Sequence, residues 1–179
     1  MANELCLYIT GLPGAGKSTI GKYVSENLSI PLLDKDDFLE SLFETRGVGD
    51  ANCRQQLSRE ADVQFINEAK ARSRVVLVSH WRPNKLQVDY GTPCDWIIDT
   101  FDSVVEIYCA CAVEIAAKRF VSRDRHPGHV DKSMSFAEIN GWLKKYAAYL
   151  PIDAGRSFKI NSENDKWKNT IDNAIQKNS

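Results

Sequence analysis

Residues Gly11 to Thr19 read GLPGAGKST, a pattern whose residue types suit the phosphates of a nucleotide. The spacing matches G-x-x-x-x-G-K-[ST] in full and lies between an apolar run and a helical stretch. Glycines let consecutive backbone N–H groups turn toward a phosphate, and the helix that follows adds the positive end of its dipole. The dinucleotide pattern G-x-G-x-x-G fails, because Thr19 stands where its third glycine is needed. We expect nucleotide contacts from Gly11, Pro13, Gly14, Ala15, Gly16, Lys17, Ser18 and Thr19.

Carboxylates follow at Asp34, Asp36 and Asp37, after a second short apolar run. In open parallel sheets, ligands bind outside the carboxyl ends of the strands, so these groups should face the same crevice as Lys17. Phosphoryl transfer needs oxygen ligands for Mg²⁺, and we assign these to Ser18 and Asp34. Asp36 is predicted to orient or deprotonate the acceptor hydroxyl, while Lys17 acts on the β and γ phosphate oxygens. In the alternative interpretation Asp36 or Asp37 only caps the next helix, and for Asp37 we expect the cap.

A third group is basic and lies at the end of a predicted helix. Arg119 and Arg123 are one helical turn apart and lead into the polar segment 122–135, which we expect to be a mobile lid. Guanidinium groups carried by a lid can neutralise charge on the transferring phosphoryl group and exclude water. We therefore predict a catalytic role for Arg123 and nucleotide binding by Arg119. The alternatives are a solvated basic face, or a metal pair at His126 and His129 that lacks a third ligand nearby.

The segment Ser79-His80-Trp81-Arg82 follows the most apolar run of the chain, so its position predicts that it lines the crevice. Arg82 would bind a polar or anionic acceptor, with Trp81 as an apolar wall. The alternative is a core tryptophan beside a surface arginine. Further candidates for the acceptor side lie in the irregular stretch that follows, and they are Asp89, Tyr90, Trp96 and Asp99.

Hydrophobic periodicity predicts the elements that position these groups. The expected strands are Leu5–Thr10, Pro31–Asp34, Arg74–Val78, Val104–Cys111 and Arg156–Ile160. The expected helices are Lys17–Leu28, Asp36–Thr45, Ala51–Arg72, Val113–Val121, Phe136–Leu150 and Glu163–Lys177. Strands that alternate with helices indicate an α/β fold, in which helices cover both faces of a parallel sheet. We expect a single domain over residues 1–179.

Composition limits the classes of function. The net charge of −1 and the pI near 6.3 argue against an extended nucleic-acid partner. The five cysteines show no CxxC spacing, and no apolar run approaches the ~18 residues of a membrane helix. The first residues, MANELCLYIT, do not resemble a signal peptide. We expect a cytoplasmic protein without membrane contact, either a monomer or a homodimer.

The chain resembles the small-molecule kinases of the P-loop nucleoside-monophosphate-kinase-like group, which includes gluconate and shikimate kinases. The resemblance covers nearly the whole length through GLPGAGKST, the D-x-D of Asp34 and Asp36, and the R-x-x-x-R of Arg119 and Arg123. It implies a three-layer P-loop NTPase fold, with five parallel strands in the order 2-3-1-4-5 and an arginine-bearing lid. In this group the first aspartate supports Mg²⁺, the second meets the acceptor hydroxyl, and the lid arginines contact ATP. The adenine would pack between the base of the lid and the loop after the last strand, at 161–163.

Two segments depart from those families. After the third strand, shikimate kinases have Gly-Gly-Gly and gluconate kinases a Ser-Ala-Leu-Lys-like sequence, whereas this chain has Ser79-His80-Trp81-Arg82. The lid sequence RHPGHVD matches neither. The resemblance therefore implies ATP and Mg²⁺ as cofactors and leaves the small-molecule acceptor open.

The sequence thus predicts an enzyme that moves the γ-phosphoryl group of Mg-ATP to a hydroxyl of a small metabolite. A steady ATPase is disfavoured, since Ser79 and His80 stand where an acidic residue would end the strand Arg74–Val78. Two alternatives stay open: a non-catalytic nucleotide-binding regulator, and a polynucleotide or toxin-type kinase.

Overall fold

The strands and helices of the chain alternate, as the periodicity predicts, in a computed structural model that describes residues 4–83, 90–129, 134–153 and 155–176. Its strands are β1 (Leu5–Gly11), β2 (Leu32–Asp34), β3 (Arg74–Val78), β4 (Trp81–Arg82), β5 (Thr92–Pro93), β6 (Ser103–Ala110) and β7 (Arg156–Asn161). Its helices are α1 (Lys17–Leu28), α2 (Lys35–Arg46), α3 (Ala51–Lys70), α4 (Asp95–Thr100), α5 (Val113–Ser122), α6 (Phe136–Ala147) and α7 (Trp167–Gln176).

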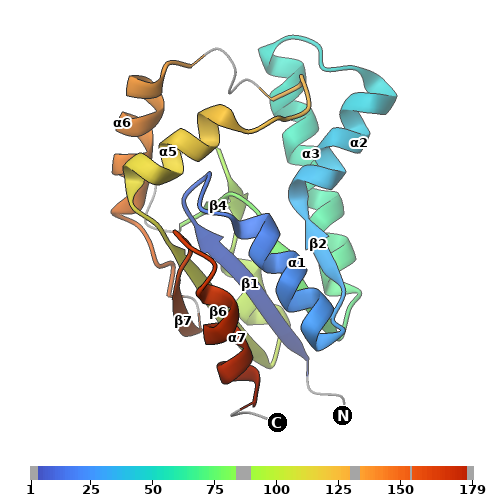
Figure 1. Cartoon of the computed structure of the whole chain (residues 1–179). Coiled ribbons are helices and arrows are strands. Elements are labelled where there is room, and N and C mark those ends of the chain that lie inside the picture. Colours follow the sequence, from blue (N-terminus) through green and yellow to red (C-terminus); the bar gives the residue numbers. More distant parts are fainter. Residues whose placement is uncertain (1–3, 84–89, 130–133, 154, 177–179) are drawn as a thin grey trace.

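The main sheet has the order β2-β3-β1-β6-β7, and all its pairings are parallel. Counted along the chain without the separate β4–β5 pair, this is the predicted order 2-3-1-4-5, so the fold class is confirmed. The central strand β1 pairs with β3 on one side and with β6 on the other, and Leu5 lies opposite both Arg74 and Ser103. Figure 1 shows α1 crossing the sheet in front of β1.

Successive side chains of the central strands point to opposite faces of the sheet, and a hydrophobic core forms on each face. Leu7 and Ile9 of β1 pack with α1, α5, α6 and α7, whereas Cys6 and Tyr8 pack with α3 and α4 on the other face. Both sets of side chains are apolar because a parallel sheet is covered on both faces. Beyond the C-terminal end of β1, α2 and α3 lie on one side and α5 and α6 on the other (Figure 1). These two helix pairs flank the candidate functional site described below.

The stretch 84–102 contains more regular structure than the sequence indicated. Residues 90–102 include β5 and the short helix α4, and β5 pairs with β4 next to the main sheet. The prediction of an irregular segment is wrong for this part, while 84–89 lie outside the described residues. Ile97 of α4 is fully buried and holds the helix against the sheet. No described helix is long and apolar enough to span a membrane.

A buried glutamate connects the sheet to the loop before β7. Glu106 of β6 is inaccessible to solvent, and its Oε1 accepts hydrogen bonds from the Thr10 hydroxyl at 2.5 Å and the Ile152 amide at 2.9 Å. Its Oε2 accepts from the Asp153 amide at 2.8 Å. These contacts satisfy two backbone donors of a segment that has no strand partner of its own. Glu106 therefore fixes the path of the chain into β7.

We predict that Glu106→Ala lowers the free energy of unfolding by about 3 kcal/mol, because two buried amides and one hydroxyl lose their acceptor. Glu106→Gln should cost less, since its single carbonyl oxygen can still accept from Thr10 and Ile152. Urea unfolding followed by circular dichroism measures both, with the exposed Glu26→Ala on α1 as the control. A loss for Glu106→Ala no larger than that of Glu26→Ala would contradict this role.

Candidate functional site

The loop between β1 and α1 is shaped to hold an anion. Gly11, Gly14 and Gly16 have φ values of 139°, 86° and 89°, in the region that favours glycine. At Gly14 a Cβ atom would lie 2.2 Å from the Ala116 carbonyl oxygen, so only glycine permits this approach to α5. The loop leads directly into the first turn of α1, whose free N–H groups and dipole attract negative charge.

Lys17 begins α1 and folds back over the loop. Its Nζ donates to the carbonyl oxygens of Gly11 at 3.0 Å and Leu12 at 3.2 Å. Burial lowers the pKa of Lys17 to about 8, and the neighbouring Arg123 charge acts in the same direction. The Lys17 ammonium is therefore desolvated, and in the ligand-free protein its hydrogen-bond acceptors are two backbone carbonyls.

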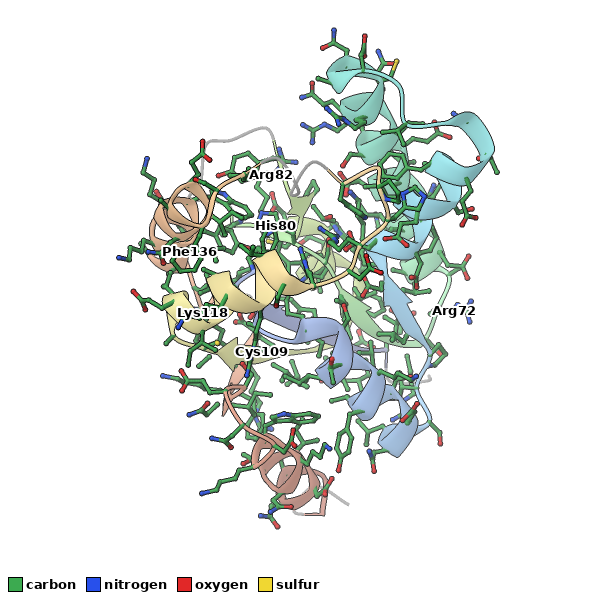
Figure 2. All side chains as sticks on the ribbon, turned by 45° about the horizontal axis from the view of Figure 1, so that its top comes forward. Arg72, His80, Arg82, Cys109, Lys118 and Phe136 are labelled. Atoms are coloured by element: carbon green, nitrogen blue, oxygen red, sulfur yellow. The ribbon has the colours of Figure 1, made fainter. Side chains whose placement is uncertain are left out.

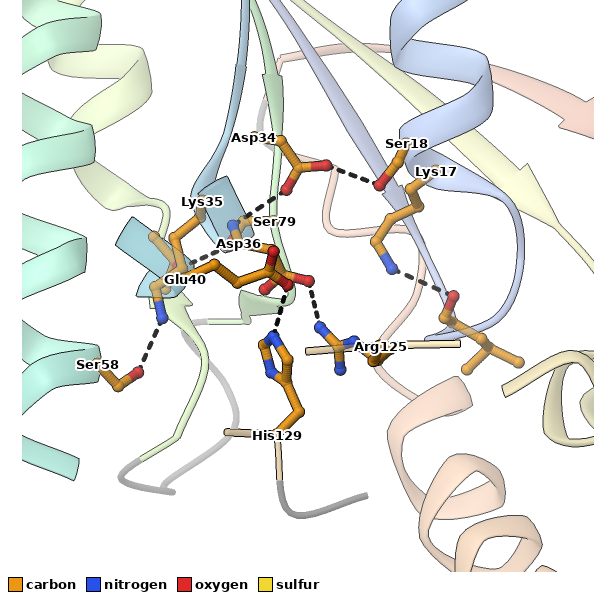
Figure 3. Close-up of polar contacts among 12 residues, drawn as sticks. Lys17, Ser18, Asp34, Lys35, Asp36, Glu40, Ser58, Ser79, Arg125 and His129 are labelled. Carbon is orange, nitrogen blue, oxygen red and sulfur yellow. Dashed lines mark hydrogen bonds and ion pairs between the residues drawn. The ribbon is translucent and has the colours of Figure 1, made fainter. Parts of the chain in front are cut away.

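Ser18 and Asp34 bring together the oxygen atoms expected at a magnesium site. The Ser18 hydroxyl donates to Oδ2 of Asp34 at 2.7 Å (Figure 3). The other carboxylate oxygen accepts from the Asp36 amide at 3.1 Å, which makes Asp34 the N-cap of α2. The sequence-based assignment of that cap to Asp36 or Asp37 is therefore wrong. Burial, followed by the charge of Asp36, raises the pKa of Asp34 to about 6.

Asp36 lies in the first turn of α2 and forms an ion pair with Arg125, which comes from the segment after α5 (Figure 3). Burial alone would raise the pKa of this carboxyl, but the Arg125 charge and smaller contributions from nearby cations hold it below its usual range. Asp36 is therefore ionised at neutral pH. The sequence suggested no partner for it, because the two residues are far apart along the chain.

The two arginines of the predicted lid have different environments. Arg119 donates through its two terminal nitrogens to the carbonyl oxygens of Ser162 and Glu163, both at 2.9 Å. It thereby joins α5 to the loop after β7. Arg123 stands at the C-cap of α5, with its guanidinium carbon 4.1 Å from the centre of the Phe120 ring. Both arginines line the cavity described below.

The next residues of the predicted lid pack on α2. The His126 ring stacks on Phe43 with 5.5 Å between ring centres, and Nε2 of His129 lies 3.0 Å from Oε1 of Glu40. Gly128 fits against the Phe43 ring, which a Cβ atom would approach to 2.5 Å. The polar composition of 122–135 gave no sign of these contacts, because their apolar partner, Phe43, lies in α2, far away along the chain. Residues 130–133 of the predicted lid lie outside the described residues.

These groups surround one cavity of about 920 Å³. Among the residues predicted for the nucleotide, Gly11 and Ala15 do not line it, because both are buried. The remaining residues predicted for the nucleotide, the metal and catalysis do line it, and they come from the loop after β1, from α1, from the start of α2 and from the end of α5. Its lining includes charged, polar and aromatic side chains, among them Lys17, Ser18, Asp34, Asp36, His80, Arg119, Arg123, Arg125 and Trp142.

The segment after β3 contributes a different residue from the one expected. His80 lines the cavity, whereas Trp81 is buried in the core, with its indole Nε1 donating to the Ile9 carbonyl at 2.8 Å. The apolar-wall hypothesis for Trp81 is wrong, and the core alternative holds. Arg82 is not part of the lining. In Figure 2, His80 lies between α6 and the α2–α3 pair.

A buried polar chain supports this end of β3. The Thr92 hydroxyl donates to Oδ1 of Asp62 at 2.7 Å and lies 2.6 Å from the Ser79 hydroxyl. Lys35 donates to Ser58 at 2.8 Å and lies 3.7 Å from the same Asp62 oxygen. The chain joins α2, α3, β5 and the end of β3, and so fixes Asp36 relative to His80.

Comparisons with known proteins agree with this geometry. The family model described as shikimate kinase matches residues 13–79, from the phosphate-binding loop to the end of β3. The cytidylate kinase of Sulfurisphaera tokodaii is 23% identical over 83% of this chain and 79% of its own length. A putative kinase from Chloroflexus aurantiacus has a TM-score of 0.72 at 18% identity, over 99% of this chain and 97% of that one.

A shikimate kinase from Acinetobacter baumannii, solved in complex with shikimate, has a TM-score of 0.60 at 18% identity, over 96% of this chain and 90% of that one. At such identities the structural likeness establishes the fold. Any conclusion about the reaction therefore depends on the residues that line the cavity.

Proposed function

We propose that the chain is a P-loop small-molecule kinase of the nucleoside-monophosphate-kinase-like group, and that it transfers the γ-phosphoryl group of Mg-ATP to a hydroxyl group of a small metabolite. The observation that carries the proposal is the convergence of Lys17, Ser18 and Asp36 on one cavity. A phosphate cradle alone would suit any nucleotide-binding protein. A second, ionised carboxylate facing the same space is the group that an acceptor hydroxyl requires.

Mg²⁺ fits the donor atoms present, since the hydroxyl of Ser18 and the carboxylate of Asp34 are hard oxygen ligands 2.7 Å apart. When bound with the nucleotide, the ion supplies positive charge to the β and γ oxygens. Asp34 is held in place by its second role as the cap of α2.

The protein residues divide the remaining tasks. Lys17 neutralises charge that grows on the β–γ bridge, and Arg119 and Arg123 do so from the α5 side. Asp36 orients the acceptor hydroxyl and takes up its proton as the new bond to phosphorus forms. Arg125 has to leave Asp36, at least in part, before the hydroxyl can reach it.

Mass spectrometry of a mixed metabolite pool, incubated with the protein and Mg-ATP, tests the proposal. We expect one class of small molecule to gain a phosphoryl group, with one ADP released per product. Lys17→Ala and an excess of chelator should each remove that product. ATP cleavage without any phosphorylated product would contradict the proposed function.

We predict that Arg123→Ala lowers kcat by about tenfold or more with a smaller change in the KM for ATP. The reason is that Arg123, at the C-terminal end of α5, packs on Phe120, so we expect its contact with the phosphoryl group to form mainly in the transition state. Arg119→Ala should instead raise the KM for ATP, because Arg119 connects α5 to the loop at Ser162 and Glu163. Steady-state kinetics with varied ATP separates the two effects.

Lys118→Ala is the matched control, since Lys118 is an exposed cation on the same helix and does not line the cavity. Its kinetics should equal those of the wild type. If Arg123→Ala behaved like Lys118→Ala, Arg123 would be an ordinary surface charge.

A further inference from the structure

His80 has two hydrogen-bonding atoms that the described part of the protein leaves unused. Both ring nitrogens are buried, and neither has a hydrogen-bond partner among the described residues. The ring is packed among aromatic side chains, with centre-to-centre distances of 4.7 Å to Tyr146, 5.6 Å to Trp142 and 6.0 Å to Tyr90. His80 also lines the cavity. A buried polar group without a partner in a native protein calls for an unseen water or ligand.

The surroundings keep this imidazole uncharged. Burial, and then the charge of Lys17, lowers the pKa of His80 to about 3. A neutral ring has one N–H donor and one acceptor nitrogen, the pair that a hydroxyl group can match. A half-turn about the Cβ–Cγ bond exchanges each nitrogen with a ring carbon, so the ring can offer a nitrogen to the cavity without moving the backbone.

The acceptor end of the cavity, defined as the part lined by α2, His80 and residues 124–129, has an acidic balance. It contains the carboxylates of Asp36, Asp37, Glu40 and Asp124. Among the described residues, Arg125 faces them and is paired with Asp36, Arg123 lies at the border of this end, and the other basic residues are the histidines at 126 and 129. The carboxylates therefore outnumber the arginines in the described part of this end. An acceptor with its own carboxylate or phosphate would meet like charge here, which disfavours binding.

We propose that the acceptor is a polyhydroxy compound without a carboxylate or phosphate group, and that His80 hydrogen-bonds to one of its hydroxyls. This inference rests on the proposed kinase function and narrows its substrate class. Trp142, which also lines the cavity, gives the apolar face of such a compound a flat surface. In the transfer, a second hydroxyl oxygen bonds to the γ-phosphorus and loses its proton to Asp36. The bond from the γ-phosphorus to the bridging oxygen breaks, and ADP leaves.

The first test is an acceptor panel assayed with Mg-ATP by mass spectrometry. It pairs sugars, polyols and nucleosides, with and without amino groups, against their matched carboxylates and monophosphates. We expect the highest kcat/KM among the members without an anionic group. A preference for a carboxylate or monophosphate would overturn this inference and leave the kinase function intact. Failure to phosphorylate any member, anionic or not, would overturn both.

The second test asks whether His80 acts through hydrogen bonds or through packing. His80→Phe keeps an aromatic ring in the cluster and removes both nitrogens, whereas His80→Gln keeps a donor and an acceptor. For the best acceptor of the panel we expect His80→Phe to raise the acceptor KM by about tenfold and the KM for ATP by less than twofold. His80→Gln should recover part of that loss.

An acceptor analogue without the bonded hydroxyl completes the cycle. With it, wild type and His80→Phe should have the same acceptor KM, because the interaction is absent from both. Thermal unfolding and ATP binding of each variant verify that it is folded. A wild-type acceptor KM for a folded His80→Phe would show that the ring serves packing alone, and would sink the assignment.

Discussion

Lys17→Ala is expected to lower kcat/KM by about 10²-fold or more while the protein stays folded. The Nζ atom of Lys17 reaches the carbonyl oxygens of Gly11 and Leu12, at the place where phosphate oxygens would bind. Its positive charge stabilises the transition state most strongly, because negative charge grows there on the oxygen that bridges the β and γ phosphates. Alanine removes that charge, and water can solvate the two carbonyls, so the loss should fall on catalysis.

Steady-state kinetics with the identified acceptor measures the loss, and urea unfolding measures the stability. Lys22→Ala is the matched control, because Lys22 is an exposed lysine on the same helix outside the cavity. Turnover by Lys17→Ala equal to that of Lys22→Ala would remove the basis for a P-loop phosphotransferase.

Asp36→Asn should lower kcat by about 10²-fold or more and leave ATP binding nearly unchanged. The amide has the size of the carboxylate but cannot accept a proton from the acceptor hydroxyl. Because the pKa of Asp36 lies below its usual range, the carboxylate is ionised over the whole neutral range. We therefore expect the pH profile of the wild-type enzyme to show no loss from this group between mildly acidic and neutral pH.

The same substitution breaks the ion pair with Arg125, so a second variant is needed. Arg125→Ala should have a smaller effect on kcat, since it frees Asp36 and leaves the proton acceptor in place. Glu44→Gln, an exposed carboxylate on α2, is the control for the loss of a charge. Equal losses in Asp36→Asn and Arg125→Ala would mean that Asp36 acts only through the ion pair.

The sequence alone was sufficient for the phosphate end of the site and for the main sheet. The loop motif is contiguous, so its residue types and spacing describe its geometry directly. Helix α1 has the predicted bounds Lys17–Leu28, because the motif fixes its start and the left-handed Ser29 ends it. The order of the main strands came from the resemblance, and the structure confirms it.

The acceptor end and the buried polar chain behind it could not be predicted in the same way, because their contacts join distant parts of the chain. Asp36 meets Arg125, and Asp62 meets Thr92, with no local pattern that signals either pair. The sequence did not indicate which of His80 and Trp81 faces the cavity. The direction of each side chain depends on the exact residue at which β3 ends. The short helix α4 was missed because a helix of six residues gives too little periodicity.

The ion pair between Asp36 and Arg125 has a kinetic consequence. In the protein without ligands, the carboxylate that would take a proton already has a counterion, so water in the cavity finds no free base. Phosphates in the loop offer Arg125 a competing anion, and its departure would uncover Asp36 for the incoming hydroxyl. The same arginine would thus make nucleotide bind before acceptor, because Asp36 becomes accessible to the acceptor hydroxyl only after phosphates have bound.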